Sequence, residues 1–203
     1  DDIQKKIENS PVNLEEGLNY RLLRLNRPNA LNAANLPMIR DLTQYFDMYE
    51  GNYRIHALVL AGAGNKAFCA GGDIKALYDN GQDDELRHNA FQFFDEEYHL
   101  NYKLATSLTP VISYLDGIVM GGGVGLSLPG QYRIATEKTV FAMPETAIGF
   151  FPDVGGSYYL PRLKAGRGIG MWLGLTGARL KGMDVWAAGV ATHFMVRLQL
   201  RCF

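Results

Sequence analysis

The stretch that decides the fold reads Val111-Ile112-Ser113-Tyr114-Leu115-Asp116-Gly117-Ile118-Val119-Met120-Gly121-Gly122-Gly123-Val124-Gly125. Its apolar start, Val111–Leu115, is typical of a buried strand, and the glycines at its end predict a tight turn into a helix. Glycine permits such a turn because it has no Cβ atom. A helix that begins there leaves backbone N–H groups without acceptors, and such groups bind anions or a developing oxyanion.

The same pattern of strand and glycine turn recurs along the chain. We predict further strands at residues 18–25, 55–60, 132–135 and 139–142, and further glycine turns at 61–64, 70–72 and 149–156. Helices are predicted between them. One carries an apolar stripe of Leu36, Ile39, Leu42, Phe46 and Tyr49, and another spans 83–107 with Phe91, Phe94, Tyr98, Tyr102 and Ala105 on its apolar side. Strands that alternate with helices predict an α/β fold with mainly parallel pairing, which we interpret as one domain over residues 1–203.

Composition excludes several classes of protein. Lys and Arg number 20 against 21 Asp and Glu, so the net charge of -1 lacks the basic excess of many nucleic-acid binders. Cys69 and Cys202 are too few for a disulfide framework. The apolar stretches are far shorter than the roughly 20 residues that span a bilayer, and the opening residues have no signal-peptide core. We therefore expect no nucleic-acid partner and no membrane partner.

The sequence does not match three common motifs, two that bind nucleotides and one that carries a nucleophilic serine. No glycine precedes Lys-Ser or Lys-Thr in the P-loop pattern. Leu126 and Leu128 stand where a dinucleotide fingerprint needs its last glycine, and Pro129 breaks the serine-hydrolase elbow around Ser127. An amide-lined oxyanion site survives these tests. The alternative is that the glycines serve only tight turns and close packing.

Two carboxylates stand among apolar residues, Glu145 after Pro144 and Asp153 after Pro152. Such surroundings remove water from an acid and raise its pKa towards the range useful for proton transfer. The alternative is that Glu145 caps a helix and Asp153 is a turn residue. The four histidines show no metal-ligand spacing, so no metal site is predicted, and Cys69 reads as a small buried side chain.

Several segments resemble the crotonase superfamily, also called the enoyl-coenzyme A hydratase/isomerase superfamily. They are Asn26-Arg27-Pro28-Asn29-Ala30-Leu31-Asn32-Ala33, Lys66-Ala67-Phe68-Cys69-Ala70-Gly71-Gly72-Asp73-Ile74, the 116–125 segment and Phe141-Ala142-Met143-Pro144-Glu145 through Gly156. The last is similar to members that hydrolyse 3-hydroxyisobutyryl-coenzyme A in valine breakdown. The resemblance implies a crotonase-like spiral of stacked β-β-α turns around a thioester pocket. Coenzyme A would be part of the substrate, and no separate cofactor is implied.

The resemblance also implies roles for particular residues. Gly72 and Gly122 match the two backbone N–H donors of the oxyanion hole. Glu145 matches the general base or nucleophile, and Asp153 the acid that positions it or shuttles the proton. Glu97 matches the acid that meets the acyl hydroxyl, although Asp95-Glu96-Glu97 taken alone reads as a solvated helix face. The backbone of Ala70, Asp73 and Ile74 matches the wall along coenzyme A.

One position separates hydrolysis from hydration within the resemblance. Hydratases carry a glutamate just after the triple glycine, where this sequence has Gly125. We therefore rank thioester hydrolysis above the alternative of an enoyl-coenzyme A hydratase or isomerase.

Superfamily members continue past Ala191-Thr192-His193-Phe194 into helices that cover the pocket and build subunit contacts, so the C-terminal part is expected to be missing here. We therefore expect the loss of that part to affect both activity and the formation of a trimer or another homo-oligomer. A non-catalytic binding or assembly subunit is a further alternative. The resemblance implies the mitochondrial matrix, with peroxisomes as the alternative.

Overall fold

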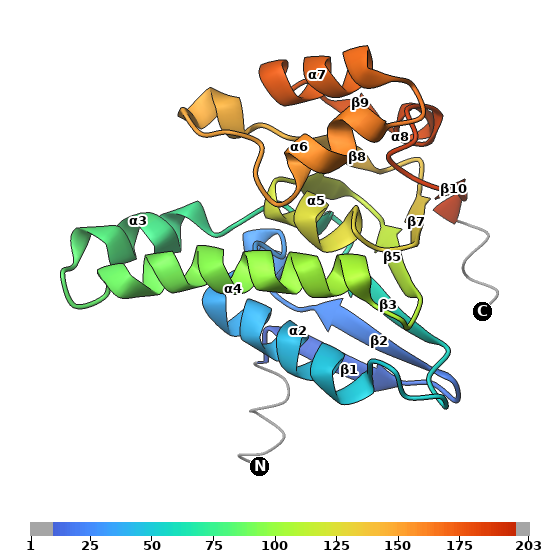
Figure 1. Ribbon diagram of the computed structural model, residues 1–203, viewed down its shortest axis with the longest axis horizontal. Helices are drawn as coiled ribbons and strands as arrows, with labels where there is room; N and C mark the ends of the chain where they lie inside the picture. Colours follow the sequence, from blue (N-terminus) through green and yellow to red (C-terminus); the bar gives the residue numbers. More distant parts are fainter. Residues whose placement is uncertain (1–9, 198–203) are drawn as a thin grey trace.

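The computed structural model describes residues 10–197, and its strands form two sheets (Figure 1). The larger sheet has the order β1 (Val12–Glu16), β2 (Tyr20–Leu25), β3 (Ala57–Gly62), β5 (Val111–Leu115), β7 (Tyr132–Ala135) and β10 (His193–Phe194). The smaller has the order β4 (Ala67–Cys69), β6 (Ile118–Met120), β8 (Val140–Ala142) and β9 (Leu180–Lys181). Only the β1–β2 and β8–β9 pairs are antiparallel in these sheets, which confirms the predicted parallel pairing.

Three successive turns of the chain each contribute one strand to each sheet and then a helical segment. β3 and β4 precede the helices α3 and α4, β5 and β6 precede α5, and β7 and β8 precede η2. This is the crotonase-like spiral of β-β-α turns that the resemblance implies, and the structure confirms it. Strands β4 and β6 have only three residues each, too few for a period-two pattern to reveal them in the sequence.

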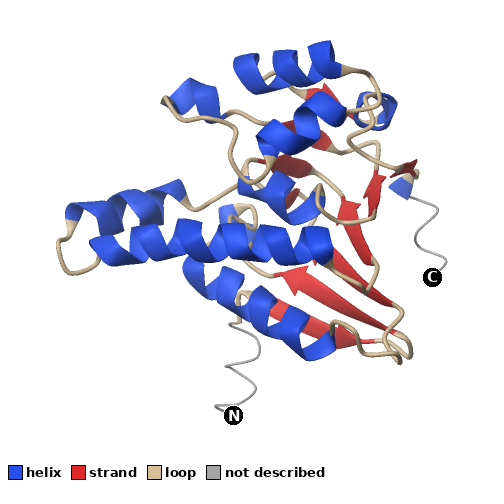
Figure 2. Ribbon diagram, viewed as in Figure 1, coloured by secondary structure: helices blue, strands red, loops and turns tan. Residues whose placement is uncertain are grey.

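The helical segments lie mostly to one side of the strands (Figure 2). They are η1 (Pro28–Ala30), α2 (Leu36–Tyr49), α3 (Ile74–Gln82), α4 (Arg87–Thr106), α5 (Gly122–Ser127), η2 (Glu145–Ile148), α6 (Gly156–Tyr159), η3 (Leu160–Arg162), α7 (Arg167–Thr176) and α8 (Met183–Ala187). Helix α2 begins where the Asn35 side chain accepts a hydrogen bond from the Met38 N–H at 3.1 Å, an N-cap, and it buries the predicted stripe from Ile39 to Tyr49. No helix within residues 10–197 is long and apolar enough to cross a membrane.

Helix α4 differs from the prediction in the face that it buries. Its buried residues are Phe93, Glu97, Leu100, Asn101 and Leu104, whereas the predicted apolar side is exposed at Phe91, Tyr98 and Tyr102. Both sets follow helical spacing, so periodicity alone could not choose between them. Packing determines which face of α4 is buried, because α4 lies against α2 and α5. Together α3 and α4 extend as an arm from the body of the molecule (Figure 1).

Candidate functional site

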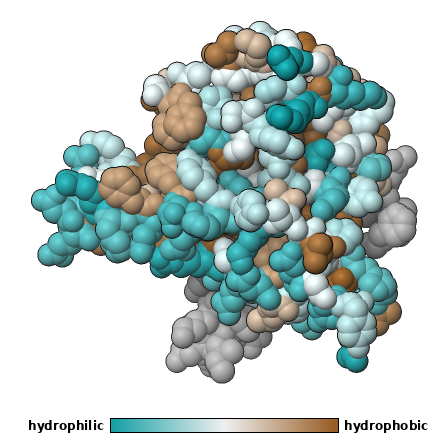
Figure 3. All heavy atoms as spheres, in the orientation of Figure 1, coloured by the Kyte–Doolittle hydropathy of each residue, from teal (hydrophilic) through white to brown (hydrophobic). Residues whose placement is uncertain are grey.

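A cavity of about 580 Å³ lies where α3, α4, α5 and η2 meet. Much of its wall is apolar, and apolar residues gather on the outer surface where the arm meets the body (Figure 3). Seven of the eight site residues predicted from the sequence line this cavity: Ala70, Gly72, Ile74, Glu97, Gly122, Glu145 and Asp153. The eighth, Asp73, is not part of the lining. The fold thus brings residues up to 83 positions apart in the sequence to the same cavity.

The first glycine turn connects β4 to α3 and is held by a bridge to Ala34. The Ala34 N–H donates to the Gly71 carbonyl at 2.8 Å, and the Asp73 N–H donates to the Ala34 carbonyl at 2.8 Å. In a parallel bridge the intervening residue directs its own N–H to the opposite side. The Gly72 N–H therefore points away from Ala34, and it has no backbone acceptor among the described residues.

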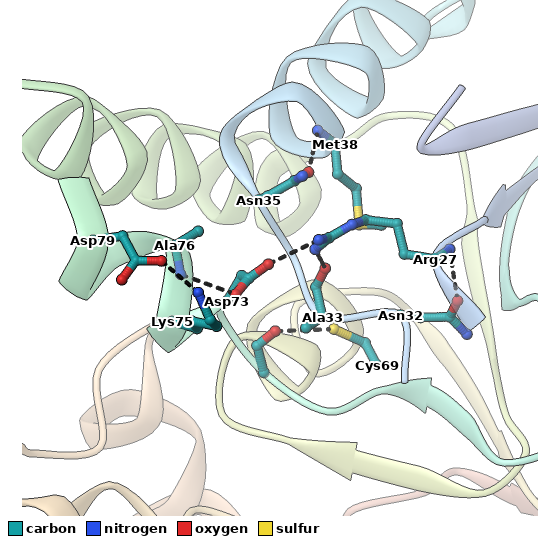
Figure 4. Close-up of polar contacts among 11 residues, drawn as sticks. Arg27, Asn32, Ala33, Asn35, Met38, Cys69, Asp73, Lys75, Ala76 and Asp79 are labelled. Atoms are coloured by element: carbon teal, nitrogen blue, oxygen red, sulfur yellow. Dashed lines mark hydrogen bonds and ion pairs between the residues drawn. The ribbon is translucent and has the colours of Figure 1, made fainter. Parts of the chain in front are cut away.

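Asp73, which does not line the cavity, supports this turn through the contacts of its carboxylate (Figure 4). One of its carboxylate oxygens accepts from the Ala76 N–H at 3.1 Å and so caps α3, and the other accepts from Arg27 Nη2 at 2.8 Å. Arg27 also donates to the Ala33 carbonyl at 2.6 Å. Burial acts to raise the pKa of Asp73, but the hydrogen bonds and charge of Arg27 and the Ala76 N–H lower it below its ordinary value.

The second glycine turn connects β6 to α5 and has almost no free space. Gly121 has a φ of +48°, which glycine adopts without strain, and Gly122 is the first residue of α5. A Cβ atom on Gly122 would lie 2.6 Å from Glu97 Oε1 and 3.2 Å from the Gly72 nitrogen. The two turns therefore meet beside the Glu97 carboxyl group, and Gly72 and Gly122 line the same cavity.

Glu97 and Glu145 bring carboxyl groups to these turns. Glu97, on α4, is 2% exposed, and a Cβ atom on Gly121 would lie 2.7 Å from Glu145 Oε1. Burial, followed by the carboxylates of Asp153 and Glu145, raises the pKa of Glu97 to about 8. Burial also raises the pKa of Glu145 to about 7, with a further contribution from Asp153 and an opposing one from its own backbone N–H.

Asp153 follows η2 on a loop that is fastened to α4. The Tyr98 hydroxyl donates to Asp153 Oδ2 at 2.7 Å, and the Phe94 ring lies 6.0 Å from that of Phe150. Burial raises the pKa of Asp153, while the hydrogen bond from Tyr98 lowers it, and the net direction is upward. Tyr98 was missed from the sequence, because it stands 55 positions from its partner and no local pattern links the two.

The residue after Asp153 explains why position 125 is glycine. Val154 is buried with a φ of +42°, a conformation that is strained for a β-branched residue. A Cβ atom on Gly125 would lie 2.5 Å from the Val154 Cβ. The Gly125 carbonyl also accepts from Asn101 Nδ2 at 3.1 Å. The position that carries a glutamate in the hydratase pattern therefore has no room for a side chain here.

Within residues 10–197 no group of three or more His, Cys, Asp or Glu side chains is arranged to hold a metal ion. Cys69 is fully buried, as predicted, and burial raises the pKa of its thiol to about 12. The alternative that Glu145 caps a helix is wrong, because Pro144 is the N-cap of η2 and no side chain makes a cap hydrogen bond there. Asp153 does lie in a turn, as its alternative expected. Both nonetheless line the cavity.

Comparison with known proteins points to one family. The profile of the enoyl-CoA hydratase/isomerase family matches residues 20–202. The mitochondrial 3-hydroxyisobutyryl-CoA hydrolase of Xenopus laevis is 55% identical over 175 residues, which cover 86% of this chain and 44% of that protein. The Homo sapiens protein of the same name is 50% identical over 174 residues, with the same shares covered. The chain spans less than half the length of these relatives.

Solved structures show the same fold. A carnitinyl-CoA dehydratase from Mycobacterium thermoresistibile matches with a TM-score of 0.88 and 38% identity. An enoyl-CoA hydratase from Rhodobacter sphaeroides matches with a TM-score of 0.86 and 37% identity. Each comparison covers 95% of this chain and 56% of the other.

Proposed function

We propose that this chain, which belongs to the enoyl-CoA hydratase/isomerase family, hydrolyses the thioester of a short 3-hydroxyacyl-coenzyme A such as 3-hydroxyisobutyryl-coenzyme A. The names of the hydrolases at 50 to 55% identity support this substrate class. The observation that carries the proposal is that Gly72, Gly122, Glu97, Glu145 and Asp153 all line one cavity.

The two glycine amides would receive the thioester carbonyl oxygen. Their N–H groups have no backbone acceptor among the described residues and line the same cavity. As the carbonyl carbon is attacked, its oxygen gains negative charge, and one donor of this kind is worth about 3 kcal/mol of barrier. The pantetheine arm would run along the Ala70, Asp73 and Ile74 backbone, at the mouth of the first turn.

Glu145 would activate the attack. With its pKa at about 7, a large share of this carboxyl group is ionised at neutral pH, and it can accept a proton from water. Water oxygen bonds to the carbonyl carbon, the C–S bond breaks, and the thiolate of coenzyme A takes the proton back from Glu145. In the covalent variant Glu145 itself attacks and water then opens the anhydride. Both routes leave a free acid and coenzyme A, with Asp153 placed to orient Glu145 or pass the proton.

Glu97 and Gly125 support the choice of substrate and reaction. The buried Glu97 has a pKa of about 8 and is mainly protonated at neutral pH, so its carboxyl group can both donate to and accept from an acyl hydroxyl. Gly125 leaves the site without the carboxylate that would hold water across a double bond, and Val154 fills the space. These two features favour hydrolysis of a hydroxyacyl thioester over hydration of an enoyl thioester.

The test measures thiol release from 3-hydroxyisobutyryl-coenzyme A by the purified chain. Glu145→Gln and Asp153→Asn should each lower kcat by at least about 100-fold while changing thioester affinity little. Glu85→Gln, an exposed position, is the matched control. Ordinary turnover by both variants would contradict the assigned roles. An assay with an enoyl thioester runs in parallel, and hydration without thiol release would establish the hydratase alternative. Absence of both reactions together with retained thioester binding would favour a non-catalytic binding subunit.

Single turnover in ¹⁸O-labelled water tests whether water attacks the Glu145 carboxyl carbon. Label recovered in the Glu145 carboxyl group would show that this residue is the nucleophile. Label found only in the product acid would show that water attacks the acyl carbon, either in the thioester or in the anhydride.

We also place the activity in mitochondria, because the similar hydrolases carry that location in their names. Fractionation of source cells with an antibody against this chain tests the location. Recovery with peroxisomal rather than matrix markers would contradict it.

A further inference from the structure

Three carboxyl groups share one cavity, and they differ in their hydrogen-bond partners. Glu97, Glu145 and Asp153 all line it, and no basic residue among the described ones does so. In addition to burial, each charge disfavours ionisation of the others: Asp153 raises the pKa of Glu97 and of Glu145, and Glu145 raises that of Glu97. Buried Glu97 Oε1 and Glu145 Oε2 have no hydrogen-bond partner in the described structure, whereas Asp153 Oδ2 accepts from the Tyr98 hydroxyl at 2.7 Å. Tyr98 is therefore the one side-chain donor that distinguishes a member of the group.

A second cavity, of about 780 Å³, lies on the other side of Asp153. Asp153 is the one residue that lines both cavities, and Tyr98 lines the second. The Tyr98 hydroxyl thus donates to Asp153 from a residue of the second cavity, whereas Glu97 and Glu145 line only the first. The titratable groups around the two cavities are Tyr78, Glu97, Tyr98, Tyr102, Glu145, Asp153, Tyr158 and Tyr159.

We propose that Tyr98 is a positioning residue whose hydroxyl keeps Asp153 ionised and oriented, so that the shared proton rests on Glu97 or Glu145. An O–H donor favours the ionised form of a carboxylate and adds a fixed direction to it. Asp153 then remains an acceptor towards Glu145, as proton shuttling requires. The catalytic part of this inference rests on the proposed function, but the assignment of charge does not.

The first test observes the charge directly and needs no turnover. Carboxyl ¹³C NMR follows the titration of Asp153 in the folded chain and in Tyr98→Phe. Removal of the donor should raise the Asp153 midpoint by roughly one pH unit. Tyr102→Phe is the matched control, because Tyr102 lies one helical turn further on, lines the second cavity and is exposed. If the titration midpoint of Asp153 is the same in Tyr98→Phe as in the unmodified chain, the proposal is overturned.

A second variant keeps the side chain and the fold. With 3-fluorotyrosine at position 98 the phenol is a stronger donor, so the Asp153 midpoint should move down, opposite to its movement in Tyr98→Phe. The direction of this shift tests the role of the hydrogen bond even if Tyr98→Phe folds poorly. A shift in the same direction, or none, would contradict a hydrogen bond that controls the aspartate.

The kinetic test uses thiol release. Tyr98→Phe should lower kcat by roughly tenfold, with KM nearly unchanged. It should also move the acidic limb of the pH–rate profile to higher pH. A purely structural role would lower the amount of folded protein without moving the limb. If the unmodified chain releases no thiol but the NMR midpoints shift as described, the proposed function fails and the role of Tyr98 in setting the charge stands. If turnover is normal in Tyr98→Phe, the catalytic part of the inference fails alone.

Discussion

The two glycine turns end on the same cavity but are built by different means. The Gly72 turn is held by polar contacts, namely the Ala34 bridge and the Arg27–Asp73 ion pair, and it leads into α3, which has no buried residue. The Gly122 turn is held by close packing, since every residue of α5 is buried. A Cβ atom on Gly123 would lie 2.3 Å from the Cys69 carbonyl oxygen. One turn therefore depends on charge, and the other on the absence of side chains.

The largest effect should come from a methyl group placed on the second turn, compared with the same change on the first. Gly122→Ala puts a carbon 2.6 Å from Glu97 Oε1 and into the space between the two amides, so thiol release should fall by about 100-fold or more. In Gly72→Ala the new atom lies 3.4 Å from the Phe93 ring, an ordinary contact, and most activity should remain. Thiol-release assays on both variants check this. Equal losses would show that the turns do not differ in free space.

A glutamate at position 125 tests the packing of the second turn. Gly125→Glu introduces the glutamate of the hydratase pattern, but its Cβ atom would collide with Val154. The free energy of unfolding should fall by about 3 kcal/mol, measured by chemical denaturation, and no hydratase activity should result. Gly81→Glu is the matched control, because a Cβ atom there meets nothing within 4 Å. A stable variant that hydrates enoyl thioesters would contradict the steric argument.

The acid beside the second turn should make stability fall as pH rises. Burial, together with Asp153 and Glu145, raises the pKa of Glu97 from 4.5 to about 8, so the folded chain binds more protons than the unfolded chain between these values. Stability is then greatest below pH 4.5 for this group and declines towards pH 8. Glu97→Gln should remove the part of the slope that Glu97 contributes, leaving that of Glu145, and stabilise the fold at pH 8 by about 1–3 kcal/mol. Denaturation at several pH values, with Glu85→Gln beside it, checks the expectation. An unchanged slope would contradict it.

The acid beside the first turn should respond in the opposite sense, with a smaller effect. The pKa of Asp73 is below its ordinary 3.8, so its contribution is present above that pH and is lost as pH falls through the folded value. Arg27→Met should cost about 1 kcal/mol at pH 7 and less in acid. Comparison with Arg24→Met, which breaks a more exposed ion pair, sharpens the result. A loss independent of pH would indicate lost packing alone.

The sequence predicted the site unevenly, and particular residues show why. Gly72, Gly122, Glu145 and Asp153 lie in segments whose letters carry the superfamily resemblance, and the structure brings all four to one cavity. Glu97 was ambiguous, because Asp95-Glu96-Glu97 looks like a charged surface. Each helical residue rotates by about 100°, so Asp95 is exposed and Glu97 is buried within the same three letters. Tyr98 had no sequence signal at all.

The letters alone determined what depends on near neighbours in the chain: apolar runs that become strands and glycines that permit tight turns. Only the tertiary structure decided which face of α4 is buried, that glycine turns 50 positions apart meet, and that three acids line one cavity. Local preferences act through contacts within a turn or two of the chain. Distances between remote residues, and the loss of water that alters their pKa values, exist only once the sheets have stacked.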